Sequence, residues 1–320
     1  MRARLALLIG LATAAPATGI GAVVFRSPPP AVATAWAARL IRVNIVGRRA
    51  DGMPDDRRDT LPRQQAALGL SAAEAARIRA TTGLVLCDLD GMKALASAVL
   101  AGDRQTLVTA AHVLRDPKRG DMELPRGTRC VFRSQSLPPE TVQLRLDGSE
   151  VLGAGGRTDM SDPNDYAVVR LAAPLRNPDA VPFPVGVPET DPGSTVLLIS
   201  AFQVDLQSTL GNRDPIAQLA EVEVAASPQP ATPRPIYLSG AMDAGGSGGP
   251  MLVRTDGTLH LAGIVSTTGN VSRDGMPFSL TMGSFIRVIT VEGPFLSAIA
   301  TVTGAAPRVA AAPSPPRPPH

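Results

Sequence analysis

Short apolar runs recur along the chain from Leu84 to Met282, and Gly, Pro, Asp or Asn separates one run from the next. Each run has the length and composition of a β-strand, and turn residues lie between them. Many short strands at this spacing are typical of an all-β barrel or sandwich. The runs read LVLCDL, ALASAVLAG, QTLVTAAHVL, RCVFR, TVQLRL, YAVVRL, STVLLIS, AQLAEVEV, PIYLSG, TLHLAGIVS and PFSLTM.

Two helices are expected at the ends of this strand region. Residues 70–80, LSAAEAARIRA, place an N-cap serine at Ser71 and an acid three residues later at Glu74, followed by good helix formers. Near the other end, the segment SFIRVITVEGPFLSAIATV favours a C-terminal helix. The chain is therefore expected to be mostly β, with a short helix before the strands and another after them.

Residues 1–25 have the layout of a secretory leader, because two arginines precede an apolar run that begins at Leu5. Small-x-small patterns at residues 15–17 and 33–35 leave the cleavage point open. If neither is used, the run is about long enough to remain as a membrane anchor. The expected location is secreted or periplasmic, with contact to a membrane only if this segment stays uncleaved.

Three further regions follow the leader. Residues 26–69 are rich in Pro, Arg and Asp and predict a linker or a loosely attached arm. Residues 70–300 are expected to form the folded domain, and the Pro- and Ala-rich residues 301–320 predict a disordered tail. The composition agrees with short elements joined by turns, since only 3% of the residues are aromatic while 30 are Gly and 31 are Pro.

Charge and cysteine content narrow the classes of function. The net charge is only +3, and no stacking aromatics accompany the arginine pairs, so no nucleic-acid partner is expected. No second His or Cys lies at ligand spacing from His112, so no metal and no other cofactor are expected. The two cysteines, Cys87 and Cys130, suit an exported protein in which they are either paired or free.

Three polar residues stand out from their surroundings. His112 follows an apolar run and two alanines, Asp165 stands at the start of the run YAVVRL, and Ser247 lies between two glycine pairs in DAGGSGGPML. Each has an ordinary structural explanation: a buried histidine, a turn-capping aspartate and a flexible linker. Their order along the chain, however, is that of the chymotrypsin arrangement and differs from the subtilisin and α/β-hydrolase orders.

The motifs TAAH, NDYAVVRL and GGSGGP resemble the three signatures of trypsin-like serine peptidases of the chymotrypsin fold, and the resemblance runs from about Thr82 to Ala300. It implies two six-stranded antiparallel β-barrels packed together, with the active site between them and the division near residues 175–190. It also implies an endopeptidase of the bacterial, secreted type that hydrolyses a polypeptide substrate through an acyl-enzyme intermediate.

The resemblance gives each residue of the motifs a role. His112 would take the proton of the Ser247 hydroxyl, and Asp165 would fix the tautomer of the histidine. The backbone N–H groups of Gly245 and Ser247 would form the oxyanion hole, where glycines keep side chains out of the way. Ser266, in the run GIVST, would hydrogen-bond Asp165 and help to shape the substrate cleft.

The same alignment places Ala241, Ser266 and Thr268 in the primary substrate pocket. Ala241 stands where an aspartate selects Lys or Arg in this family, and Thr268 replaces a glycine that keeps a deep pocket open. Asp243 is expected on the pocket wall, facing solvent or capping the loop. We therefore expect cleavage after small or medium uncharged side chains.

Two departures from the family pattern bear on activation and on disulfides. Gly246 stands where activated zymogens carry an aspartate, so chains that begin anywhere between Ala66 and Ala80 are expected to be similarly active. Val113 replaces the usual cysteine after the histidine. Cys87 and Cys130 lie on strands that the resemblance makes neighbours in the first barrel, and we expect them to form a disulfide.

Two other functions stay open. One is a binding module with a protease fold that has lost turnover, because an occluded cleft is not visible in a sequence. The other is a quality-control peptidase that resembles the HtrA group, suggested by the sequence around the serine. That group usually adds a PDZ domain, for which few residues follow the expected barrel.

Overall fold

The computed structural model describes residues 56–89, 92–116, 122–124, 127–153, 163–186, 192–207, 214–225, 235–270 and 284–304. The expected leader or anchor, the first part of the expected arm and residues 305–320 of the expected tail lie outside these ranges. The first residues of the expected tail, 301–303, are the end of the C-terminal helix. Among the helices within them, none has both the length and the apolar character needed to cross a membrane.

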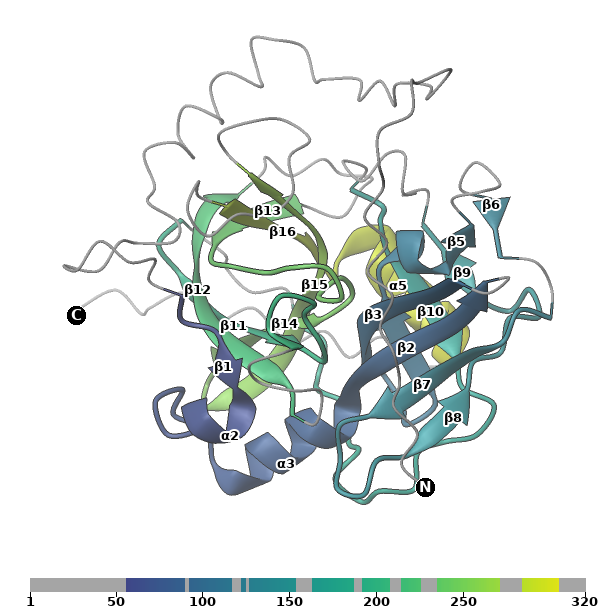
Figure 1. Ribbon diagram of the computed structural model, residues 1–320, viewed down its shortest axis with the longest axis horizontal. Coiled ribbons are helices and arrows are strands. Elements are labelled where there is room, and N and C mark those ends of the chain that lie inside the picture. Colours follow the sequence, from purple (N-terminus) through teal and green to yellow (C-terminus); the bar gives the residue numbers. More distant parts are fainter. Residues whose placement is uncertain are drawn as a thin grey trace, which may run out of the picture.

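Six strands of the second half close into an antiparallel barrel (Figure 1). Pairing of β12 with β13 closes the barrel, and the two-residue strand β1 adds to its outside by pairing with β12. In spatial order the strands are β1 (Asp59–Thr60), β12 (Ile216–Ala225), β11 (Thr195–Ser200), β14 (Pro250–Thr255), β15 (Thr258–Asn270), β16 (Ser284–Thr290) and β13 (Pro235–Ser239).

The first half of the chain forms another antiparallel sheet, which we call the first sheet. It curls into a half-barrel beside the closed barrel (Figure 1). Its outer strands are only two and three residues long, and an isolated bridge between Leu144 and Leu171 links its two sides. In spatial order the strands are β8 (Thr141–Gln143), β7 (Cys130–Ser134), β2 (Thr82–Leu89), β3 (Met92–Leu100), β4 (Thr106–Thr109), β10 (Ala167–Arg170) and β9 (Val151–Leu152). A separate pair consists of β5 (Arg115–Asp116) and β6 (Met122–Glu123).

The apolar residues form separate cores inside the two sheets and a third core between them. On β16 the side chains alternate, so that Ile286 and Val288 fill the closed barrel while Ile289 faces the core between the sheets. The connecting chain passes through this junction, because Phe183 bridges to Ala101 and Val185 bridges to Leu261.

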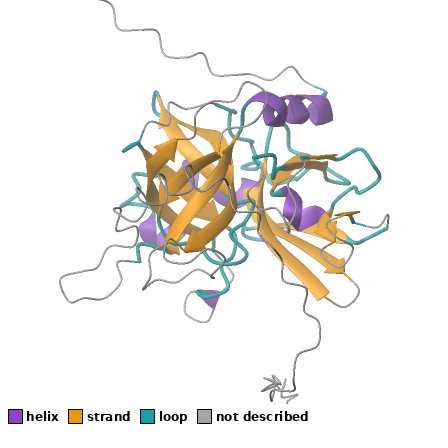
Figure 2. Ribbon diagram, turned by 90° about the horizontal axis from the view of Figure 1, so that it is seen from above, coloured by secondary structure: helices purple, strands orange, loops and turns teal. Residues whose placement is uncertain are grey.

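Both expected helices are present (Figure 2). α3 (Ala72–Thr81) begins with the expected capping box, in which Ser71 Oγ accepts from the Glu74 amide and the Glu74 carboxylate accepts from the Ser71 amide. α5 (Gly293–Thr303) follows β16 and stacks Phe295 on Tyr166, with 4.5 Å between the ring centroids. The mostly β architecture with one helix before the strands and one after them is therefore confirmed.

The last part of the expected arm is attached more firmly than its composition suggested. β1 pairs with β12, and the short helix α2 (Leu61–Gln64) follows directly. Leu61 is fully buried in the core between the sheets, and its amide donates to Pro215 O at 2.7 Å. One apolar anchor and a two-residue ladder thus outweigh the polar, Pro-rich character of the segment.

The disulfide between Cys87 and Cys130 is confirmed. The two residues face each other on the neighbouring strands β2 and β7, with 4.1 Å between their Cα atoms. Both lie in the core of the first sheet. The bond therefore crosslinks two strands that the sheet already pairs.

Replacing both cysteines by alanine is expected to lower the free energy of unfolding by roughly 3–4 kcal/mol, because the bond closes a long loop in the unfolded chain. The sequence separation of the two residues is 43. Denaturant unfolding of the oxidised wild type and of the double variant measures the difference, and reduced wild type is the control. Equal stability of all three proteins would contradict the expectation.

Candidate active site

His112 and Asp165 are bonded to each other in the interior. His112 lies on the 3₁₀ turn η1 (Ala111–Leu114), which follows β4, and Asp165 lies just before β10. Because β4 and β10 are paired neighbours, the ends of these strands bring the two residues together. His112 Nδ1 lies 2.9 Å from Asp165 Oδ2, and the His112 amide donates to Asp165 Oδ1 at 2.9 Å.

Ser266, at the far end of β15, adds a third contact to this aspartate. Its hydroxyl donates to Asp165 Oδ2 at 2.5 Å, and both residues are fully buried. Ser266 belongs to the closed barrel, whereas Asp165 and His112 belong to the first sheet. The hydrogen bond therefore crosses the junction between the two sheets.

Asp165 is held as a carboxylate. Burial alone would raise its pKa, but attraction to the His112 ring and hydrogen bonds from His112 and Ser266 outweigh burial and lower the pKa below its ordinary value. An ionised carboxylate only accepts hydrogen bonds, so Nδ1 of His112 carries the proton of this bond. In the neutral ring the other nitrogen, Nε2, is then left as the acceptor.

Ser247 lies in a turn between β13 and β14, and we call residues 241–249 the serine loop. Gly245 and Gly248 have φ values of +96° and +80°, in the left-handed region that favours glycine. A Cβ on Gly248 would lie 2.1 Å from Ser97 O, and one on Gly245 would lie 2.5 Å from Phe202 Cδ1. The glycines are thus required by backbone shape and by close packing, which excludes the flexible-linker interpretation.

Ser97, on β3, fastens the serine loop to the first sheet. Its amide donates to Ser247 O at 2.8 Å, and its hydroxyl donates to Gly245 O at 2.7 Å and accepts from the Ala201 amide at 2.9 Å. Ser97 is fully buried. Ser97 was not among the residues predicted from the sequence, although a lone hydroxyl within the apolar run ALASAVL indicates a buried polar contact.

Ser247 lies close to the segment that carries His112. A Cβ on the next residue, Gly248, would lie 2.2 Å from Thr109 Oγ1 and 3.1 Å from the Ala110 amide, just before η1. No hydrogen bond joins the Ser247 hydroxyl to the His112 ring within the described ranges. In enzymes without substrate such bonds are often long and tighten only when substrate binds.

The expected oxyanion donors lie in the same loop. The amide of Gly246, between them, donates to Asp243 O at 3.1 Å, and this bond shapes the turn. Neither the Gly245 nor the Ser247 amide donates to another group in the part of the chain that the structure describes. Two backbone donors are thus left in the turn that carries the serine.

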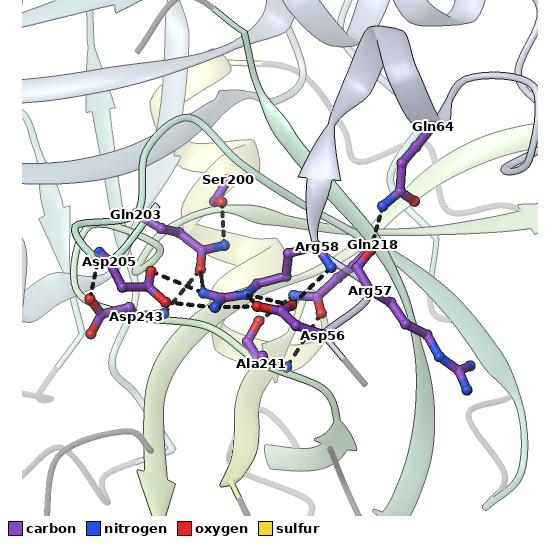
Figure 3. A network of polar contacts seen from close by, with 10 residues as sticks. All are labelled: Asp56, Arg57, Arg58, Gln64, Ser200, Gln203, Asp205, Gln218, Ala241 and Asp243. Carbon is purple, nitrogen blue, oxygen red and sulfur yellow. Dashed lines mark hydrogen bonds and ion pairs between the residues drawn. The ribbon is translucent and has the colours of Figure 1, made fainter. Parts of the chain in front are cut away.

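The residues expected to form the pocket come from two segments. Ala241 opens the serine loop and is held by the buried Gln218, whose Nε2 donates to Ala241 O at 2.6 Å (Figure 3). Ser266 and Thr268 lie on β15, where Thr268 pairs with Ile286 of β16. Ser266 is fully buried, with its hydroxyl on Asp165, and Thr268 is half-buried.

A side chain at position 246 would meet the buried methionine of the same loop. A Cβ on Gly246 would lie 2.4 Å from both Cγ and Sδ of Met242, which packs in the core of the closed barrel. The space that an aspartate side chain at position 246 would need is thus occupied by the apolar side chain of Met242.

Gly246→Ala is therefore expected to lower the free energy of unfolding by about 1–3 kcal/mol, the usual cost of overpacking. Gly246→Asp is expected to cost more, because it also brings a carboxylate against apolar atoms. Denaturant unfolding measures both. As a control, Met242→Ala in the same chain should reduce the cost of Gly246→Ala. A fully stable Gly246→Asp would show that the site has room for an acid.

Comparison with known proteins gave one family match and several solved structures of similar fold. The model of the Trypsin family matches residues 76–289, which is more than half of the chain. No curated protein sequence matches. Among solved structures, a Glu endopeptidase in complex with MPD is 12% identical with a TM-score of 0.53, covering 79% of this chain and 99% of its own.

Two other solved structures are similar at lower TM-scores. The thermostable serine protease AL20 from an extremophilic microorganism is 14% identical, with a TM-score of 0.48, and covers 70% of this chain and 97% of its own. The protease Anisep from Arthrobacter nicotinovorans is also 14% identical, with a TM-score of 0.47 and coverage of 71% and 96%. The family match and the shared chymotrypsin-like fold lead to one conclusion: this chain belongs to the trypsin family and is a serine-type peptidase.

Proposed function

We propose that the chain is an exported endopeptidase in which Ser247, His112 and Asp165 act as a catalytic triad. The observation that carries the proposal is the buried chain of hydrogen bonds from Ser266 through Asp165 to His112. It fixes the ring of His112, whose preceding residues Thr109 and Ala110 lie against the serine loop. A histidine with a purely structural role has no need of a buried, ionised carboxylate. Here Asp165 is kept ionised by hydrogen bonds from His112 and Ser266.

In the proposed first step, Ser247 Oγ attacks the carbonyl carbon of a peptide bond while Nε2 of His112 takes the hydroxyl proton. Asp165 keeps the ring oriented and stabilises the imidazolium that forms. His112 then gives the proton to the leaving amine, and the C–N bond breaks to leave an acyl-enzyme. Water, activated by the same histidine, releases the acid product and restores Ser247.

The tetrahedral intermediates carry negative charge on the former carbonyl oxygen. The Gly245 and Ser247 amides are the proposed donors to this oxygen, and the contacts of Ser97 with the carbonyl oxygens of the same two residues support their orientation. Fixed donors of this kind are each worth about 10²–10³ in rate. In this mechanism, the glycine-rich turn stabilises the negative charge of the tetrahedral intermediates.

Export is supported by the disulfide between Cys87 and Cys130, because such bonds persist mainly in oxidising compartments. The proposed substrate is therefore a polypeptide met outside the cytosol.

Ser247→Ala and His112→Ala are each expected to abolish nearly all peptide hydrolysis while leaving the fold intact, because the triad acts as a unit. A fluorophosphonate should label wild type at Ser247 and leave Ser247→Ala unlabelled. His260→Ala is the matched control and should be labelled normally, since His260 lies on β15 apart from the proposed triad. Undiminished hydrolysis by Ser247→Ala would refute the mechanism, and an unlabelled, inactive wild type would favour a silent binding module.

At the expected base of the proposed pocket, the described part of the chain places Ala241 and no acid. Asp243 is the nearest candidate, but its Oδ2 accepts from the Asp205 amide at 3.0 Å, so its carboxylate already caps a neighbouring turn. The residue at the expected base is Ala241, with its backbone carbonyl bonded to Gln218. A basic substrate side chain would therefore lose water without gaining a charge partner from either residue.

A peptide library is expected to show cleavage after small or medium uncharged residues such as Ala, Val, Thr or Leu. One methylene in such a pocket discriminates by only about 1–3 kcal/mol, so the preference should be graded. Mass spectrometry of the products identifies the residue before each cleaved bond. Dominant cleavage after Arg or Lys would mean that Asp243 reaches the pocket.

A further inference from the structure

Arg58, just before β1, places a buried cation behind the serine loop (Figure 3). Its side chain has no exposed surface, while its partners Asp56 and Asp205 are 21% and 27% exposed. Nη2 donates to Asp56 Oδ2 at 2.7 Å and to Asp205 Oδ2 at 2.6 Å, and Nε donates to Asp56 Oδ1 at 2.9 Å. The guanidinium therefore joins the N-terminal segment to the chain that follows β11.

The same guanidinium reaches the serine loop through one glutamine. Nη1 of Arg58 donates to Gln203 Oε1, and the same oxygen accepts from the Asp243 amide at 3.1 Å. Gln203 is buried, and its Nε2 donates to Ser200 Oγ at 2.9 Å. The position of Gln203 is thus set from both ends, and its carbonyl oxygen holds the backbone of Asp243.

A second route runs through Asp205. Its carboxylate accepts from Arg58, and its amide donates to the carboxylate of Asp243 at 3.0 Å. The neighbouring Val204 amide donates to Ala244 O at 3.0 Å. Asp243 O in turn accepts from the Gly246 amide, one residue before Ser247. Two hydrogen-bonded paths therefore lead from Arg58 to the turn that carries the serine and its oxyanion donors.

Arg58 remains protonated in this buried site. Burial alone would lower its pKa, but hydrogen bonds and attraction from Asp56 and Asp205 raise the pKa above its ordinary value. The cation is also fixed in place from its own side, because β1 pairs with β12 directly after it and Leu61 is buried.

We propose that Arg58 is a positioning residue of the active site, which holds the serine loop in its working shape through Gln203 and Asp205. The proposal rests on the proposed function of Ser247. In this proposal, a side chain from the N-terminal segment orders the serine loop. The residue directly before Ser247 is Gly246 and not an acid, so no acid at that position can do so. The proposal also reverses the expectation for chains that begin between Ala66 and Ala80, since these would lack Arg58 and β1.

The test compares full-length variants by their reaction with a fluorophosphonate, which separates the binding constant KI from the rate of bond formation, kinact. Arg58→Met keeps the length and removes the charge, and kinact is expected to fall about 100-fold, the scale of a small misplacement of reacting groups. KI should stay nearly unchanged. Arg58→Lys should recover part of the rate, because it restores the charge without the planar fork.

Arg57→Met is the matched control, because Arg57 is the adjacent arginine and its exposed side chain points away from the network (Figure 3). Its kinact should equal that of wild type. The variant with both Gln203→Met and Asp205→Ala removes the side chains of the two paths, and adding Arg58→Met to it should slow it hardly further. Near-ultraviolet circular dichroism establishes that each variant is folded.

The outcomes separate the two proposals. A wild type that is not labelled at Ser247 refutes the proposed function, and the role of Arg58 with it. A labelled wild type together with unchanged kinact in Arg58→Met overturns the role of Arg58 alone. If Arg58→Met does not fold, a wild-type kinact in the variant that carries both Gln203→Met and Asp205→Ala overturns it equally.

Discussion

The contact between Ser97 and the serine loop is the constraint on which the active-site region depends. Ser97 belongs to the first sheet, and its backbone and hydroxyl bond to residues on both sides of Gly246 in the second. Backbone can approach backbone this closely only where no side chain intervenes, so the loop must be built from glycine. Removing the Ser97 hydroxyl would leave a buried carbonyl and a buried amide unpaired, which is far more costly than the mean value of a hydrogen bond.

A division of roles between the two sheets follows from this contact. The first sheet carries His112 and Asp165, and the closed barrel carries Ser247 and Ser266. The Ser266–Asp165 bond crosses the junction in one direction and the Ser97 bonds cross it in the other. Small shifts between the sheets therefore change both the position of the serine and the orientation of the histidine, which makes the apolar core between the sheets part of the site.

The sequence predicted those features that depend on short-range patterns. Alternating apolar runs predicted the strands, and Ser71 and Glu74 predicted the start of α3. The disulfide followed from the family resemblance, which made the strands of Cys87 and Cys130 neighbours. The approach of His112 to Asp165 followed from a family resemblance, since 53 positions separate them. Arg58 was not predicted, because its partner Asp205 lies 147 positions away and an arginine in a polar, Pro-rich stretch has the appearance of a solvated residue.

The proposed role of Arg58 is related to the absence of an acid at Gly246. The absence of an acid at that position removes one means of ordering the serine loop, but it does not remove the need to order it. Met242 fills the space beside Gly246 with apolar atoms, so a charge is excluded there and has to act from farther away. Near the edge of the loop, the buried cation is paired with the carboxylates of Asp56 and Asp205, which themselves keep part of their contact with solvent. A guanidinium suits this place better than an amine, because its planar fork bonds two carboxylates and an amide oxygen at once.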